Sequence, residues 1–98
     1  MYGKKVSEQM INELFELIAS LQNAEDCREL FGDLCTNKEI EQMAQRISAA
    51  KLLIEGKTYQ QVTDSLEISS ATLSRVSRCV RYSKGYNKFL KPPFQIVE

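Results

Sequence analysis

The sequence predicts an all-α protein of about five to six helices, two of which form a helix-turn-helix. Apolar residues recur at helical spacing along most of the chain, and helix-capping residues precede successive apolar segments. No convincing pair of strands accompanies them. The 98 residues suggest one domain, or one protomer of an assembly, and the 43% of apolar residues can supply a packed core.

The first two helices are expected in the acidic N-terminal part of the chain. Ser7 and Asn23 are residue types that cap helix N-termini, and an apolar face follows each of them. The face after Ser7 consists of Ile11, Leu14, Phe15, Ile18 and Leu21, and the face after Asn23 of Cys27, Leu30, Phe31 and Leu34.

A longer helix is expected next, opened by the capping box that Thr36 and Glu39 can form. Its apolar stripe is Ile40, Met43, Ala44, Ile47, Ala50 or Lys51, and Ile54, and Leu52 and Leu53 widen it. We therefore expect burial on more than one side. Gly56 suits the left-handed position at the end of such a helix.

Two short helices follow, within residues 58–83. Thr58 and Gln61 form a second capping box, and Ser69 or Ser70 can cap the second helix, which should end near Gly85. The inward positions are Val62, Leu66, Ile68 in the turn, Leu73, Val76 and Val80. Residues 84–98 are expected to form a brief turn through Tyr86–Leu90 and then an extended tail with Phe94, Ile96 and Val97. The tail is not helical because Pro92 and Pro93 prevent further helix.

This pair of helices is the part of the sequence that suggests a function. The spacing of its apolar residues leaves the first turn of the second helix exposed. The side chains there are small and polar, with two arginines, and can enter a major groove: Ser69, Ser70, Thr72, Ser74, Arg75 and Arg78. The turn has Glu67 where a helix-turn-helix usually has glycine. The alternative interpretation is an ordinary corner between packed helices, which would show the same apolar spacing.

Acidic residues predominate in the first half of the chain and basic residues in the second half, although the net charge is zero. Residues 1–49 carry five basic and nine acidic residues, whereas residues 50–98 carry eight and four. Residues 68–97 contain no acid and six bases: Arg75, Arg78, Arg81, Lys84, Lys88 and Lys91. This segment favours a polyanionic partner, with a solvated basic tail as the simpler alternative.

The composition argues against an enzyme, a metal site and a membrane protein. There is no histidine, no Cys-x-x-Cys spacing, no glycine-rich phosphate loop and no long apolar run. We expect Cys27, Cys35 and Cys79 to be reduced and mostly buried, and a redox role for Cys79, beside Arg75 and Arg78, is the weaker reading. No secretory signal is recognisable, so a cytoplasmic location is expected.

The segment Ala71-Thr72-Leu73-Ser74-Arg75, with Gly56 after a long helix, resembles the Trp repressor family. The resemblance is closest to the YerC/YecD-type relatives of Gram-positive bacteria, over roughly residues 5–90. It implies a single Trp-repressor-like domain over residues 1–98, an intertwined homodimer built on helices within 7–56, and a helix-turn-helix at 58–83. Sequence-specific binding of double-stranded DNA and transcription regulation, with repression as the expected effect, follow from the same resemblance.

Individual positions carry this resemblance further. The DNA-facing matches are Ser70, Ala71 and Ser74 for bases, and Tyr59, Gln60 and Thr63 nearer the backbone. Arg46 and Arg75 match the two arginines that embrace the corepressor, with Thr72 close by, which implies a small carboxylate effector. Val76 replaces the family's glycine and should fill the indole slot, which argues against tryptophan as corepressor. Arg46 can instead be an ion-pair partner of Glu39 or Glu41.

A different class of function also fits the sequence. The basic helix and the apolar C-terminal tail, with Phe94, Ile96 and Val97, would suit a protein-interaction module with an acidic partner. Removal of residues 92–98 discriminates between the two readings, because it should abolish binding of a protein partner and leave DNA affinity unchanged.

Overall fold

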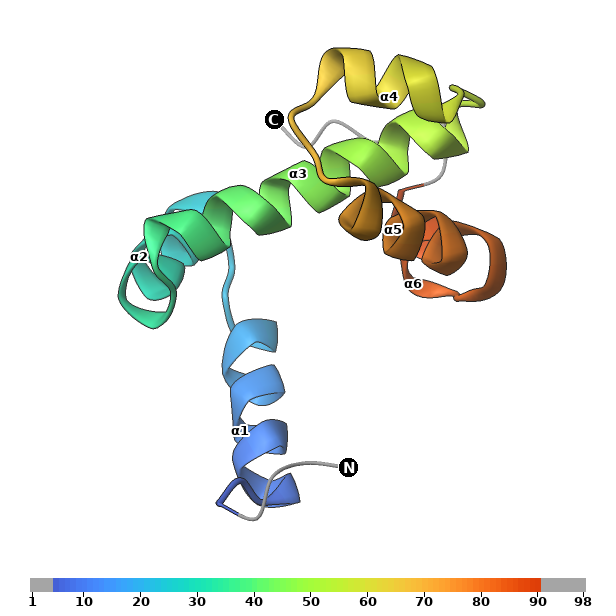
Figure 1. The fold of residues 1–98 in the computed structure, drawn as a ribbon. Helices are drawn as coiled ribbons and strands as arrows, with labels where there is room; N and C mark the ends of the chain where they lie inside the picture. The colour runs from blue at the N-terminus through green and yellow to red at the C-terminus, as the bar shows by residue number, and fades with distance from the viewer. Residues whose placement is uncertain (1–4, 91–98) are drawn as a thin grey trace. The chain divides into compact units, whose positions relative to one another are not determined.

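The computed structural model describes residues 5–90, and all six regular elements in this range are helices (Figure 1). They are α1 (Glu8–Ala19), α2 (Ala24–Leu34), α3 (Asn37–Ile54), α4 (Tyr59–Ser65), α5 (Ser70–Tyr82) and α6 (Gly85–Phe89). The predicted all-α class is confirmed. The extended tail with Phe94, Ile96 and Val97, and Lys91, lie outside the described residues.

The described chain divides between Asn37 and Lys38 into two compact units. The N-terminal unit, residues 5–37, contains α1 and α2, and the C-terminal unit, residues 38–90, contains α4 to α6 and all but the first residue of α3.

Both helices of the N-terminal unit begin at the predicted caps. The Ser7 Oγ accepts a hydrogen bond from the backbone N–H of Met10 at 3.2 Å, and the Asn23 Oδ1 accepts one from Asp26 at 2.8 Å. A cap of this kind satisfies one of the backbone donors that a helix leaves open at its start, and typically stabilises the helix by about 1 kcal/mol. Local sequence therefore determines where these two helices start.

The apolar faces of α1 and α2 remain largely uncovered. Neither helix contributes a buried residue, although Ile11, Leu14 and Ile18 are half-buried. Phe15 and Leu34, which the apolar spacing placed on these faces, are 60% and 50% exposed. The N-terminal unit thus has apolar stripes and no core of its own.

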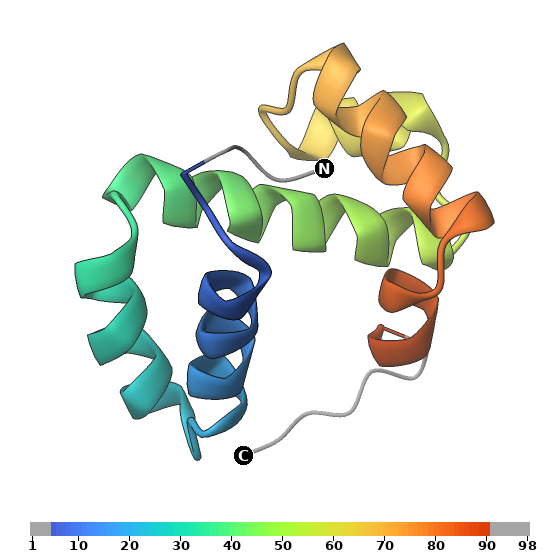
Figure 2. The same ribbon diagram turned by 90° about the horizontal axis from the view of Figure 1, so that it is seen from below.

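The C-terminal unit has a small and well-defined core. In Figures 1 and 2, α4, α5 and α6 gather around the C-terminal half of α3. The buried apolar residues come from three helices: Ala49, Ala50, Val62, Leu73 and Val76. Leu52, Leu53, Leu66, Ile68, Val80, Tyr86 and Leu90 pack against them. The predicted inward positions of the two short helices are confirmed.

Glycine and capping chemistry determine how α3 passes into α4. Gly56 has φ +96°, the left-handed conformation expected at the end of α3. Thr58 then opens α4 with the predicted reciprocal capping box, in which its Oγ accepts from the N–H of Gln61 and its own N–H donates to the Gln61 side chain. The short connection reverses the chain within a few residues, so that α4 can pack on α3.

The prediction of a turn through Tyr86–Leu90 was wrong. Helix α5 ends at Tyr82, close to the end expected near Gly85, and the segment expected to be a turn contains the short helix α6. Tyr86 and Leu90 lie four residues apart and both pack on the core, which favours a helical turn there. Asn87 supplies the second cause, since its side chain binds the carbonyls of Val80 and Ser83.

All three cysteines are free, and each is half-buried, less than the mostly buried state expected. Among residues 5–90, no helix is long and apolar enough to cross a membrane. The same residues hold no group of three or more cysteines and carboxylates placed to bind a metal ion.

Candidate nucleic-acid interface and adjoining pocket

Helix α4 presents the three side chains that the resemblance assigned near a DNA backbone. Tyr59, Gln60 and Thr63 are all exposed, while Val62 of the same helix is fully buried. The Gln60 Nε2 donates to Asp64 Oδ1 at 2.8 Å, and the Thr63 Oγ1 donates to the Gln60 carbonyl at 3.0 Å. These local bonds hold the exposed side chains close to the helix.

Ser69, one of the two caps predicted, is the N-cap of helix α5. The Ser69 Oγ accepts a hydrogen bond from the N–H of Thr72 at 3.1 Å, and Ser70 and Ala71 are exposed beside it. The first turn carries no acidic residue. Its remaining N–H groups and the positive end of the helix dipole therefore offer an attractive surface to an anion.

Arg75 and Arg78, two of the arginines of α5, lie on its exposed side, three residues apart. Arg75 and Arg78 are exposed, whereas Leu73, Val76 and Ser77 are buried. Residues three apart on a helix are neighbours, so the two guanidinium groups can serve one surface. This surface adjoins the exposed first turn.

Two of the predicted DNA-facing positions are less exposed than expected. Thr72 and Ser74 are half-buried. The Ser69 hydroxyl donates to the Thr72 Oγ1 at 2.9 Å, so the Thr72 hydroxyl takes part in the cap. Within residues 69–78 the exposed positions are accordingly Ser69, Ser70, Ala71, Arg75 and Arg78.

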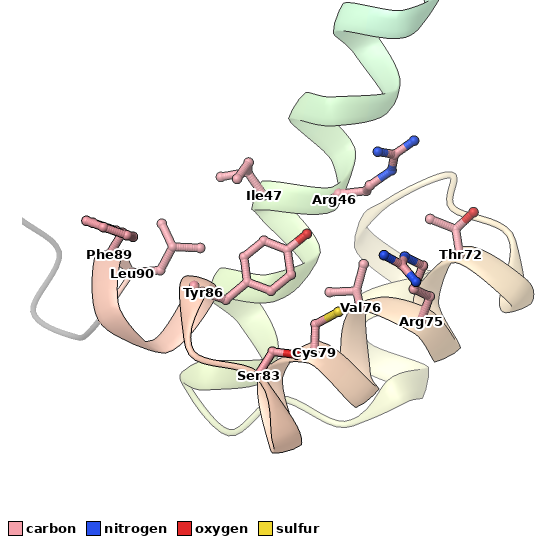
Figure 3. A pocket seen from close by; sticks show the side chains of 11 residues that line it. Arg46, Ile47, Thr72, Arg75, Val76, Cys79, Ser83, Tyr86, Phe89 and Leu90 are labelled. Carbon is pink, nitrogen blue, oxygen red and sulfur yellow. The ribbon is translucent and has the colours of Figure 1, made fainter. Parts of the chain in front are cut away.

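A pocket of about 420 Å³ opens beside this surface, between α3, α5 and α6 (Figure 3). Arg46 reaches it from α3, and Thr72 and Arg75 reach the same end from α5. The structure thus brings together the three residues expected at an effector site. Arg46 is exposed and borders the pocket, and the alternative that it serves as an ion-pair partner stays a prediction.

The other walls of the pocket are apolar and come largely from α6. Tyr86, Phe89 and Leu90 line it, together with Val76 and Cys79 from α5. The sequence did not point to these α6 residues, because their segment was expected to form a turn. The spacing of Tyr86 and Leu90, together with a preceding glycine, was the available signal.

Val76 lies between the core and the pocket. Its side chain is 1% exposed and belongs to the core, and it also lines the cavity. Cys79, expected on a buried face, is half-buried and lines the same wall.

Comparison with known proteins identifies the family. The family model described as "Trp repressor protein" matches residues 9–92. The chain belongs to the Trp repressor family.

Individual members support this assignment along most of the chain. The YerC protein of Bacillus subtilis (strain 168) is 42% identical over 78 residues, which cover 80% of this chain and 75% of that protein. A crystal structure of a Trp repressor candidate from Staphylococcus aureus shares 36% identity, with a TM-score of 0.81, over 92% of this chain and 91% of the other. A TrpR-like protein from Eubacterium eligens ATCC 27750 shares 36% identity, with a TM-score of 0.78, over 88% and 90%. The predicted Trp-repressor-like fold is therefore confirmed.

Proposed function

We propose that this member of the Trp repressor family is a sequence-specific DNA-binding transcriptional regulator that reads DNA through α4 and α5. The observation that carries the proposal is the two-sided character of α5. Leu73 and Val76 anchor one side in the core, while the first turn, Arg75 and Arg78 stay exposed on the other. An anchored helix with an exposed, acid-free start can enter a major groove without rearrangement.

The chemistry of each side chain suggests which part of the DNA it would contact. Arg75 and Arg78 meet phosphates or the O6 and N7 acceptors of guanine, and Ser70 and Ala71 lie where base edges would pass. Tyr59, Gln60 and Thr63 on α4 face the sugar-phosphate backbone. Lys84 and Lys88 add attraction that is independent of sequence. Repression of the bound gene is the expected effect.

We assign the exposed apolar faces of α1 and α2 to a second copy of the chain. Phe15, Leu17 and Leu34 are each at least 50% exposed, although helices with apolar stripes normally bury them. A second copy is the occupant that suits the function, because a two-fold dimer offers two reading helices to half-sites about one DNA turn apart. A homodimer thus explains why the apolar faces of α1 and α2 are exposed in a single chain. It also supplies two copies of the reading head, which consists of α4 and α5.

The experiment that tests this proposal is selection of bound duplexes from a random pool by the purified full chain. We expect enrichment of a two-fold symmetric site whose half-sites lie about 34 Å apart along the duplex. Affinity for that site should fall steeply with rising salt as phosphate counterions are released. Failure to enrich any sequence, even at low salt, would contradict the proposal. It would favour the alternative hypothesis that the chain is a protein-interaction module.

The pocket favours a small effector as a second element of the function. Its end with Arg46 and Arg75 suits a carboxylate, and its walls with Val76, Tyr86 and Leu90 suit an apolar body. A panel of small carboxylates and matched amides, added to the DNA-binding assay, tests this element. A carboxylate should change DNA affinity where its amide does not, and Arg46→Ala should abolish the change.

A further inference from the structure

A hydrogen bond connects the middle of α3 to the turn between α4 and α5. The Gln45 side chain is half-buried on α3, and its Nε2 donates to the backbone carbonyl of Glu67 at 2.9 Å. The two residues are 22 positions apart in the chain. This is a contact between separate elements, unlike the capping bonds, which are local.

The carbonyl of Glu67 is one that the turn itself does not satisfy. The N–H of Ile68 donates to the carbonyl of Leu66 at 3.0 Å, which forms a tight three-residue turn centred on Glu67. The first backbone bond of α5 runs from Leu73 to the carbonyl of Ser69 at 2.9 Å. The Glu67 carbonyl belongs neither to the bond that closes the turn nor to the first backbone bond of α5. The Gln45 side chain supplies its hydrogen-bond donor.

Gln45 also borders a polar hollow of about 220 Å³ beside the start of α5. Gln42, Gln45 and Arg46 line it from α3, and Ile68, Ser69 and Thr72 line it from the turn and α5. Ser69 and Thr72 form the cap of the proposed reading helix. The Gln45 bond therefore acts at the point where the chain enters that helix.

We infer that Gln45 is a positioning residue for DNA recognition, which holds the turn and the first turn of α5 in a fixed place on α3. The inference rests on the proposed function and deepens it. Base contacts require side chains placed to within a fraction of an ångström, whereas phosphate attraction tolerates displacement. Loss of the bond should therefore reduce affinity for the specific site and leave non-specific affinity unchanged.

The sharpest test compares Gln45→Glu with Gln42→Glu. Both exchange an amide for a carboxylate on the same face of α3 and beside the same hollow, so they add the same charge at similar places. Only Gln45→Glu removes the donor to Glu67. A second variant, Gln45→Met, removes the donor without adding charge, and Gln45→Arg restores an N–H donor, with Gln42→Arg as its charge-matched control.

Two measurements are made on the full-length variants, after circular dichroism has confirmed their helical content. Amide hydrogen exchange of the free protein at residues 67–73 should be faster by roughly 5- to 10-fold in Gln45→Glu and Gln45→Met, the factor expected for one lost hydrogen bond. It should stay unchanged in Gln42→Glu. The Kd for the selected duplex should rise by a similar factor relative to the Gln42 controls, with Kd for a scrambled duplex unchanged, and Gln45→Arg should restore both values.

Unchanged exchange in both Gln45→Glu and Gln45→Met would overturn the inference. Faster exchange with undiminished specific affinity would overturn it as well, because the bond would then stabilise the turn without aiding recognition. If the wild-type chain prefers no sequence at all, the proposed function fails and the role in recognition fails with it. The exchange measurement, which needs no DNA, distinguishes that failure from the failure of the bond itself.

Discussion

The side-chain amide of Asn87 donates a hydrogen bond to the carbonyl of Val80 at 2.5 Å and so ties α6 to the end of α5. A second, longer bond from the same amide reaches the carbonyl of Ser83 at 3.4 Å. Carbonyls in the last turn of a helix lack intrahelical partners, and here a residue of the next helix satisfies them. The bond thereby places Tyr86, Phe89 and Leu90 against the pocket.

Replacement of Asn87 by alanine should destabilise the C-terminal unit. It leaves the part-buried carbonyl of Val80 without this donor, which costs about 1–2 kcal/mol of unfolding free energy. Urea unfolding at fixed protein concentration measures the change. Asn12→Ala, at an exposed position on α1, serves as the control and should stay within about 0.5 kcal/mol of the wild type. Equal stability of the two variants would show that Asn87 does not hold α6.

Replacement of Phe15 by serine should weaken the proposed dimer. Phe15 is 60% exposed on α1, so its loss opens no cavity within a single chain and removes apolar area from the interface. Sedimentation equilibrium should show a shift toward monomer, with helical content retained. Tyr82→Ser is the control, because Tyr82 is 82% exposed on α5 and has no place in the proposed interface. A dimer equally strong in both variants would contradict the assignment of α1.

Replacement of Arg78 by alanine should weaken DNA binding without dissociating the dimer. If Arg78 contacts one phosphate, the slope of log K against log salt should fall by about 1, and specific and non-specific affinity should fall together. If it contacts guanine instead, the loss should be about 1–3 kcal/mol and confined to one base position. Arg28→Ala, at an exposed position on α2, should change neither quantity. Unaltered binding by Arg78→Ala would exclude it from the interface.

Tryptophan should not raise the DNA affinity of the wild-type protein. Val76 lies on the pocket wall. The resemblance to the Trp repressor family implies a glycine at this position that leaves room for the indole, and we expect the branched side chain of Val76 to take up that room. Fluorescence anisotropy of a labelled duplex, titrated with and without tryptophan, measures the response. An increase of tenfold or more would show that the remaining space beside Val76 admits an indole.

Deletion of residues 92–98 should leave DNA affinity within about twofold of the wild type. The proposed reading surface lies on α4 and α5, and the removed segment contains no basic residue. Anisotropy with the selected duplex checks this result. A loss of binding would favour the alternative in which the apolar tail contributes to partner recognition.

The features that the sequence predicted correctly are those that neighbouring residues determine. Ser7, Asn23 and Ser69 cap their helices within three residues, and the bonds at these caps depend on little else. The inward positions Val62 and Leu73 follow from helical spacing, and the structure buries both. Arg46, Thr72 and Arg75 line one pocket, and their role in binding an effector stays a prediction.

The features that the sequence did not predict depend on residues far apart in the chain or on packing between helices. Helix α6 is held by Asn87 through the carbonyl of Val80, seven residues earlier, and no local pattern encodes that bond. The bond from Gln45 to Glu67 spans 22 residues. Thr72 was expected to be exposed, and it is half-buried beside the pocket that α3, α5 and α6 form.

Protection from hydrogen exchange on binding the selected duplex tests the central claim most directly, because it shows which surface meets DNA. We expect protection at residues 59–63 and 69–78, and little change at residues 85–90 of α6. Protection confined to α6 and the pocket, with none at residues 69–75, would contradict the assignment of α4 and α5 as the reading head.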